Sequence, residues 1–404
     1  MIIRVIGLYL IIVGISTLII KAFFVKKNNN IPTKKVNNGN YAFLIPARNE
    51  SKVIEGLLKS IKDQTRKIPS KNVYVIVEDK KDPTVEIVKK YKMNIVFRHD
   101  LSKKRKGYAL DDAIKEILAK NKSYDAYFIM DADNVLDNNF VMEMEKDINR
   151  SYDIGIGYRN CKNGNDSPVA ACSSLTFSMI NEFSNVQKAK DTRNLTISGT
   201  GFFIRGDIIE SLGGYPFFSL TEDYELTLYA ILNNLTTTYN KKAIFFDEQP
   251  IEYKKSITQR VRWIKGYFEA RKKYIGKIID SMDTNDKNYG SKLTEIIGVW
   301  HYIIMIIGAV LFFLSDLIEL FYRKTLLSNF ANMILLIFMI YFILLLFTWR
   351  LLVIEKDKIN LNEETKVKAL FFNPIFLASY VRCALIALFK KEVKWDVIEH
   401  KKNM

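Results

Sequence analysis

The chain has 404 residues, of which 49% are hydrophobic, and a formal net charge of +16. That length allows one large domain or two smaller ones, with apolar sequence left over. The three cysteines and three histidines are scattered, which excludes a disulfide framework and a cysteine or histidine metal cluster, so any metal must be held by oxygen.

Three uncharged segments predict helices that span a membrane. Residues 5–20, 296–314 and 330–349 each approach the roughly 20 apolar residues that cross a bilayer. The first segment could also be a cleaved signal peptide, because Arg4 precedes it, but no small-residue cleavage site follows it. We therefore expect at least three spans.

A fourth apolar segment, residues 369–389, is interrupted by Asn373, Pro374 and Arg382. A single crossing would leave the basic C-terminal tail outside the cell, against the rule that positive charge stays in the cytoplasm. We favour an interfacial or re-entrant helix over a crossing.

Much of the excess positive charge lies beside these apolar segments. The lysines concerned are Lys21, Lys26, Lys27, Lys34, Lys35, Lys390, Lys391, Lys394, Lys401 and Lys402. Their positions predict an external N-terminus, a cytoplasmic region from about 26 to 292 and contact with membrane lipid rather than nucleic acid. The expected divisions are a membrane helix (1–25), a linker (26–40), a cytoplasmic domain (41–250), an interfacial helix region (251–292), two membrane helices (293–320 and 329–354) and a C-terminal segment (355–404).

The cytoplasmic domain begins with alternating strands and helices. Strands are expected at 41–45, 73–77, 95–97 and 127–130, and helices at 51–61, 84–91 and 108–118. This order predicts an α/β fold with a largely parallel sheet that is covered on both faces.

Polar residues follow three of these strands. Asp131 and Asp133 follow the fourth strand. Their carboxylates suit Mg²⁺ or Mn²⁺, and such a cation could bind a nucleotide diphosphate at this edge of the sheet. The alternative is an Asx turn that ends the strand. Asp79 follows the second strand and could accept a base N–H or close a turn. The basic run 103–106 before Gly107 could hold phosphate at a helix start, or could be a solvated charged surface.

The second half of the domain has a different pattern. Residues 167–190 predict a long amphipathic helix, and Gly199–Gly201 predict a flexible turn before a strand. Thr221 is expected to be the N-cap of a helix whose first turn contains the acidic residues Glu222 and Asp223. In the basic helix expected at 256–274, the side chains of Gln259, Arg262 and Trp263 share one face. That face suits a diphosphate and a sugar, and also an anionic membrane surface.

These motifs resemble, in kind and order, the membrane-embedded family-two glycosyltransferases with a Rossmann-like GT-A domain, which include cellulose, chitin, hyaluronan and poly-N-acetylglucosamine synthases. The resemblance covers residues 41–274 or so. The matching elements are Ile45–Glu50, Asp79, Lys106–Leu110, Asp131–Asp133, Gly199–Gly201, Thr221–Asp223 and the QxxRW box Gln259–Trp263.

The resemblance implies a role for each motif residue. Asp223 is implied to be the general base, and Asp131 and Asp133 the ligands of Mg²⁺ or Mn²⁺. Donor-binding residues are implied to be Ala47, Arg48, Glu50, Asp79 at the uracil, Lys106, Asp131 and Arg262. Acceptor-binding residues are implied to be Gly199, Thr200, Gly201, Glu222, Gln259 and Trp263. The turn 78–82 is more basic than is usual in the family, which weakens the base contact.

The implied activity is inverting transfer from a UDP-sugar to a growing β-linked polysaccharide at the plasma membrane, with the catalytic domain in the cytoplasm. Processive synthesis, assistance in export, and accessory subunits or homo-oligomers accompany this expectation. One alternative is a non-processive transferase that acts on a lipid-linked acceptor. Another is a non-catalytic basic protein that binds a membrane surface.

Overall fold

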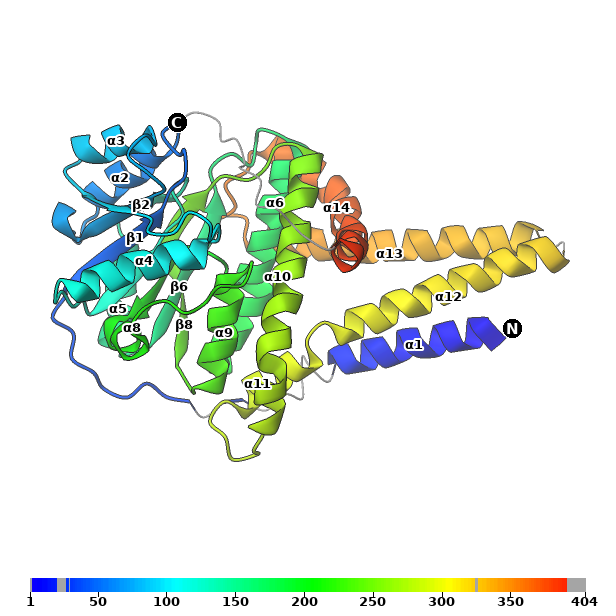
Figure 1. Ribbon diagram of the computed structural model, residues 1–404. Coiled ribbons are helices and arrows are strands. Elements are labelled where there is room, and N and C mark those ends of the chain that lie inside the picture. Colours follow the sequence, from blue (N-terminus) through cyan, green and yellow to red (C-terminus); the bar gives the residue numbers. More distant parts are fainter. Residues whose placement is uncertain (1, 20–26, 29, 324–325, 391–404) are drawn as a thin grey trace.

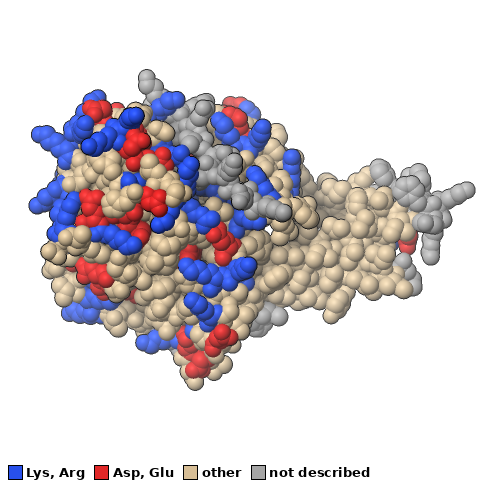
Figure 2. Space-filling view, in the orientation of Figure 1, with Lys and Arg blue, Asp and Glu red and all other residues tan. Residues whose placement is uncertain are grey.

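The computed structural model describes residues 2–19, 27–28, 30–323 and 326–390. Figure 1 shows a globular part built around a sheet and a group of long helices that project from one side of it. Figure 2 shows that charged side chains cover the globular part, whereas the projecting helices are almost free of charge on the visible face.

One eight-stranded sheet forms the centre of the globular part. Its strands are β1 (Tyr41–Pro46), β2 (Val73–Val77), β3 (Asn94–Phe97), β4 (Ala126–Ile129), β5 (Val135–Leu136), β6 (Ile154–Cys161), β7 (Phe202–Arg205) and β8 (Thr237–Asp247). Their order is β3-β2-β1-β4-β7-β6-β8-β5. Strands β3, β2, β1 and β4 are parallel to one another, β7 runs antiparallel to both of its neighbours, and β6 and β8 are again parallel.

Helices cover both faces of the sheet, and the alternation of side chains along β1 shows why. Phe43 and Ile45 pack in one core with α2 (Ile54–Lys62), α3 (Thr84–Lys90) and α5 (Phe140–Asn149). Leu44 points to the other core, with α4 (Lys106–Ala119), α8 (Gly206–Leu212) and α9 (Glu222–Leu232). A strand that is apolar on both faces requires two such layers, and the expected α/β class is confirmed.

The second half of the domain departs from the sequence expectation. Strand β6 was not expected, and of β8 the sequence predicts only residues 243–246 as a strand. The helix expected at 167–190 is three segments, α6 (Pro168–Met179), a π-helical stretch (Ile180–Asn185) and α7 (Val186–Lys190). β6 contains glycines and Asn160, which hide it from a search for β-branched residues.

The remaining helices follow the sheet in the chain. They are α10 (Tyr253–Asp280), α11 (Tyr289–Ile297), α12 (Trp300–Arg323), α13 (Leu326–Ile354) and α14 (Glu363–Phe389), together with α1 (Ile2–Ile19) at the N-terminus. Among the described residues, Tyr289–Glu319, Ala331–Ile354 and Glu363–Phe389 are long and apolar enough to cross a membrane, and Ile2–Thr17 is a shorter apolar helix.

Helices α1, α12 and α13 extend together away from the sheet (Figure 1). Gly7 and Gly308 let α1 and α12 approach closely, because a Cβ added to either glycine would lie 2.8 Å or less from the other's carbonyl oxygen. Helix α14 instead stays against the globular part. The Arg260 guanidinium of α10 lies 4.1 Å from the centre of the Phe376 ring and donates to Ser379 Oγ at 2.8 Å. These contacts hold α14 beside α10 and the globular part.

Candidate active site

The turn after β4 carries the two carboxylates that the sequence singled out. The Asp131 N–H donates to Thr200 Oγ1 at 2.8 Å and to Asn134 Oδ1 at 3.1 Å, which ties this turn to the Gly199–Gly201 turn. The Glu248 N–H, just beyond β8, donates to Asp133 Oδ2 at 3.2 Å. Thr200 was predicted to lie near an acceptor, but its side chain is fully buried and holds the turn.

Lys106 joins the turn after β4 to the Gly199–Gly201 turn and to the start of α9. Its ammonium group lies 2.5 Å from Asp131 Oδ1, donates to the Gly199 carbonyl at 2.7 Å and lies 3.8 Å from Glu222 Oε1. Burial acts to lower its pKa, but Asp131 and Glu222 outweigh that effect and raise the pKa of Lys106. Gly107 is required beside it, because an added Cβ would meet the Phe217 carbonyl oxygen at 1.8 Å.

The first turn of α9 brings two carboxylates to the same place. Burial, opposed by Lys106 and reinforced by Asp223, raises the pKa of Glu222 to about 7. Burial also raises the pKa of Asp223. Asp223 Oδ2 would lie 3.6 Å from a Cβ on Gly199, so the acid faces that turn. Thr221 is at the N-cap, but its hydroxyl makes no capping bond, so capping does not explain the motif.

Helix α10 presents the QxxRW box to this cluster. A Cβ on Gly266 would lie 2.6 Å from the Thr221 side chain, so α10 packs tightly on the start of α9. Arg262, one turn earlier on the same face, is close enough for Glu222, Asp131 and Asp223 to act on it electrostatically, and burial lowers its pKa despite them. Trp263 lies edge-on to Phe177 of α6, with ring centres 5.8 Å apart. Gln259 is partly exposed on the same helix face.

A cavity of about 130 Å³ opens at the carboxyl ends of the parallel strands. The predicted donor residues that line it are Ala47, Arg48, Glu50, Lys106, Asp131 and, with them, Asp133. Lys104 and Arg105 of the basic run 103–106, which could hold phosphate, also line it, and so do Glu78 and Arg98, which the sequence reasoning missed.

Asp79 does not line this cavity. Its exposed carboxylate accepts from the Lys81 N–H at 2.6 Å, as a turn residue would, whereas the preceding Glu78 lines the cavity and pairs with Arg48 at 3.0 Å. An acidic pair directly after a strand does not reveal from sequence which member turns inward.

A family model described as "Glycosyltransferase like family 2" matches residues 38–266, more than half of the chain. The chain belongs to this family.

Relatives and solved structures agree with that assignment. Poly-beta-1,6-N-acetyl-D-glucosamine synthase of Staphylococcus epidermidis is 26% identical over 233 residues, 57% of this chain and about half (55%) of that protein's length. The probable glycosyltransferase YdaM of Bacillus subtilis is 25% identical over 371 residues, 87% of this chain and 84% of that protein. The solved mannosyltransferase of Pyrobaculum calidifontis shares the fold, with a TM-score of 0.62, 13% identity and coverage of 96% of this chain and 100% of that one.

That mannosyltransferase was solved in complex with GDP-Man and Mn²⁺. The residues of this glycosyltransferase fit such an ion, because Asp131 and Asp133 offer hard oxygen ligands at the wall of the donor cavity. Within the described residues no group of three or more acidic, histidine or cysteine side chains could hold a metal alone.

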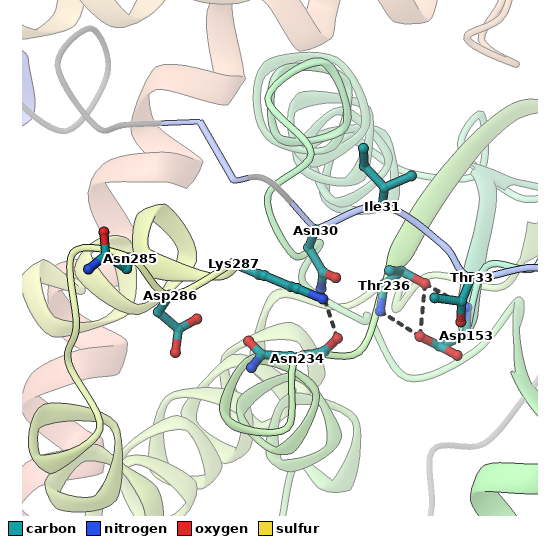
Figure 3. Close-up of a pocket in the computed structure, with 9 residues that line it drawn as sticks. All are labelled: Asn30, Ile31, Thr33, Asp153, Asn234, Thr236, Asn285, Asp286 and Lys287. Atoms are coloured by element: carbon teal, nitrogen blue, oxygen red, sulfur yellow. Dashed lines mark hydrogen bonds between the residues drawn. The ribbon is translucent and has the colours of Figure 1, made fainter.

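A second cavity, of about 340 Å³, lies away from these residues (Figure 3). Segments far apart in the chain meet there. Asn30 donates to the Asn234 carbonyl at 2.8 Å, and Asp153 accepts from the Thr236 N–H at 2.7 Å and from its hydroxyl at 2.8 Å. None of the predicted site residues lines this cavity.

Proposed function

We propose that this glycosyltransferase is an inverting, metal-dependent enzyme that transfers a hexose or N-acetylhexosamine from a UDP-sugar to a growing β-linked polysaccharide. The name of its staphylococcal relative supports a poly-N-acetylglucosamine-like product and processive synthesis. Since the match spans about half of that relative, product and processivity are both part of the proposal, as is assistance in export.

One observation carries the proposal. In the donor half of the site, the cavity at the strand ends, Asp131 contacts Lys106 and Asp133 lines the same cavity. In the acceptor half, the start of α9 and the turn 199–201, Glu222 and Asp223 act on the charge of the same lysine. A reaction between a diphosphate-bound sugar and a hydroxyl needs both kinds of carboxylate within reach of one reacting carbon.

The donor half is assigned to the nucleotide. Asp131 and Asp133 hold Mg²⁺ or Mn²⁺, which neutralises diphosphate charge when bound. Ala47, Arg48 and Glu50 line the same cavity, and we assign the uracil contact to the acidic pair Glu78–Asp79, of which Glu78 lines the cavity. Lys106, kept protonated by its acidic neighbours, faces the diphosphate.

The acceptor half is assigned to bond formation. The acceptor hydroxyl oxygen attacks the anomeric carbon from the face opposite the diphosphate, and the hydroxyl proton passes to Asp223. The bond to UDP breaks with its electron pair on the diphosphate, where Arg262 and Lys106 stabilise the charge. Attack from the opposite face inverts the anomeric configuration, so an α-linked donor gives a β-linked product.

The membrane arrangement fits this chemistry. Gly199, Gly201, Glu222, Gln259 and Trp263 are assigned to the acceptor, and α10, which carries two of them, packs on the apolar helix α14. A sugar acceptor held there lies close to the membrane helices. We place the catalytic domain in the cytoplasm of a multi-pass plasma-membrane protein, because the basic residues beside the apolar segments favour that side.

Inverted membrane vesicles test the proposal. They are supplied with radiolabelled UDP-glucose, UDP-N-acetylglucosamine, UDP-glucuronic acid or GDP-mannose, with Mg²⁺ or Mn²⁺, and the product is sized and digested with linkage-specific glycosidases. We expect one UDP-sugar to give a β-linked polymer, and EDTA to stop its formation. Transfer only from GDP-mannose, an α-linked product or full activity in EDTA would contradict the proposal. Label found only in the lipid extract would favour the lipid-linked acceptor.

A further inference from the structure

Arg159 on β6 is a nearly buried arginine that the proposed roles leave unused. Its side chain is 12% exposed. Its Nε donates to Asp247 Oδ2 at 2.8 Å, Nη2 donates to the same oxygen, and Nη1 donates to the Ser198 carbonyl at 2.8 Å. The plane of its guanidinium lies over Phe177, 3.6 Å from the ring centre.

Each of these contacts leads to a different part of the site. Asp247 ends β8, and the next residue, Glu248, donates its N–H to Asp133. Ser198 precedes Gly199, whose carbonyl accepts from Lys106. Phe177 is the ring against which Trp263 packs. The Arg159 guanidinium thus contacts one residue beside each of three parts of the site. Those parts are Asp133, the Gly199–Gly201 turn and Trp263.

We propose that Arg159 is a positioning residue that fixes the separation between the Asp133 side of the site and the Gly199–Trp263 side. This inference rests on the function proposed above. Arg159 touches no reacting atom, so its effect is on geometry: donor and acceptor each bind on one side, and transfer needs the two sides in register.

The chemistry of the pair explains why an arginine is needed. Asp247 is buried, its Oδ2 accepts from Arg159 and from Gln249 Nε2 at 2.6 Å, and its Oδ1 has no hydrogen-bond partner among the described residues. A guanidinium offers a planar fork for the carboxylate while a further N–H reaches the Ser198 carbonyl. A lysine ammonium keeps the charge but not the fork.

The guanidinium charge also reaches the proposed base. Burial raises the pKa of Asp223, and Arg159 is among the groups that act against this rise. Removing the charge at position 159 should therefore raise the pKa of Asp223 further. A purely structural ion pair remote from the base has no such effect.

The test compares two buried arginines of adjacent strands in the full-length membrane protein. Arg205 of β7 is 5% exposed, donates to the Val36 carbonyl at 3.0 Å and lies 3.4 Å from Asp207. Within the described part of the chain it makes no hydrogen bond or ion pair with an active-site residue. Arg159→Lys should lower kcat about 10–100-fold, the range for groups that orient ligands, while Kd for the UDP-sugar changes little. Arg205→Lys should lower thermal stability comparably but leave kcat near the wild-type value.

A second comparison, between a variant that removes the charge at position 159 and one that keeps it, tests the effect on the base. Arg159→Met should move the acid limb of the pH profile of kcat to higher pH, whereas Arg159→Lys should leave the limb in place. If Arg159→Met fails to fold, Asp247→Asn, which keeps the shape of the side chain, should reproduce the kcat loss of Arg159→Lys. Equal kcat in Arg159→Lys, Arg205→Lys and wild type would overturn the inference alone. Wild-type protein that transfers no sugar from any donor would instead overturn the proposed function and this inference with it.

Discussion

The two halves of the sheet build the site in different ways. In the donor half, parallel strands β1, β2 and β4 end at one edge, and the residues that follow them line the cavity. In the acceptor half, the antiparallel strand β7 and the helices α9 and α10 bring together Gly199, Asp223 and Arg262 from segments far apart in the chain. The donor half depends on strand ends, and the acceptor half depends on how closely helices pack.

This difference predicts that substitutions in the two halves impair different steps of the reaction. A change in the donor half should weaken nucleotide binding, since its residues form one cavity. A change in the acceptor half should leave nucleotide binding largely intact and reduce transfer. Lys106, Asp131 and Glu222 form a direct chain of charge between the halves.

The largest effect is expected for Asp223→Asn. An amide cannot accept the hydroxyl proton, so kcat should fall by about 10²–10⁴-fold, the usual contribution of a general base. Calorimetric titration with the UDP-sugar and Mn²⁺ should give a Kd close to that of the wild type. Asp133→Asn is the matched donor-half variant and should lose both binding and transfer. Equal binding losses in the two variants would remove the distinction between the halves.

The pH profile should report the acceptor half. Burial raises the pKa of both carboxylates of α9, that of Glu222 to about 7, and a base works only when it is deprotonated. Transfer should therefore begin to fall at a higher pH than it would with an ordinary aspartate as the base. Glu222→Gln removes a negative neighbour of Asp223 and should shift the limb to lower pH, as kcat measured between roughly pH 5 and 9 would show. If the acid limb of the pH profile did not shift in Glu222→Gln, Glu222 would have no effect on the pKa of the base.

Trp263→Ala should affect the acceptor more than the donor. The indole packs on Phe177 and offers a face for sugar C–H groups, so its loss should raise the acceptor KM by about tenfold, the equivalent of roughly 1.4 kcal/mol. Trp263→Phe keeps an aromatic face and should recover part of that loss. Kinetics with a short oligosaccharide acceptor, at saturating UDP-sugar, provide the measurement. An equal rise in the KM for the UDP-sugar would contradict the assignment of Trp263 to the acceptor.

The donor half could be predicted well from the sequence. Its strands are unbroken apolar runs, and the carboxyl ends of parallel strands share an edge, so Asp131 was expected at that edge. The family resemblance added Arg48 and Lys106 as donor-binding residues. The exception is Asp79, where the direction of the chain in a tight turn decides which of two adjacent acids faces the cavity.

The acceptor half could be predicted only as motifs. Nothing local indicates that Arg159, in a strand with two glycines, contacts Asp247 and Ser198. The first contact depends on the register between β6 and β8, and the second on the path of the chain before β7. The hydroxyl of Thr221 suggests a helix cap, yet packing against Gly266 buries it instead. Tertiary packing, which sequence periodicity does not contain, decides these positions.

The smallest effect tests that packing directly. In Gly266→Ala the new methyl would lie 2.6 Å from the Thr221 side chain and 2.8 Å from its backbone nitrogen, so α10 must move away from the start of α9. Overpacking of this kind costs about 1–3 kcal/mol, and the shift should carry Arg262 away from Asp223 and lower kcat several-fold. Gly276, on the same helix, has open space around its Cβ position. Gly276→Ala should instead stabilise the protein by about 0.5–1 kcal/mol, because alanine favours the helix, and leave kcat unchanged. Thermal unfolding in detergent and single-turnover transfer measure the two effects, and a Gly266→Ala enzyme as active as Gly276→Ala would show that the acceptor half tolerates looser packing than its geometry indicates.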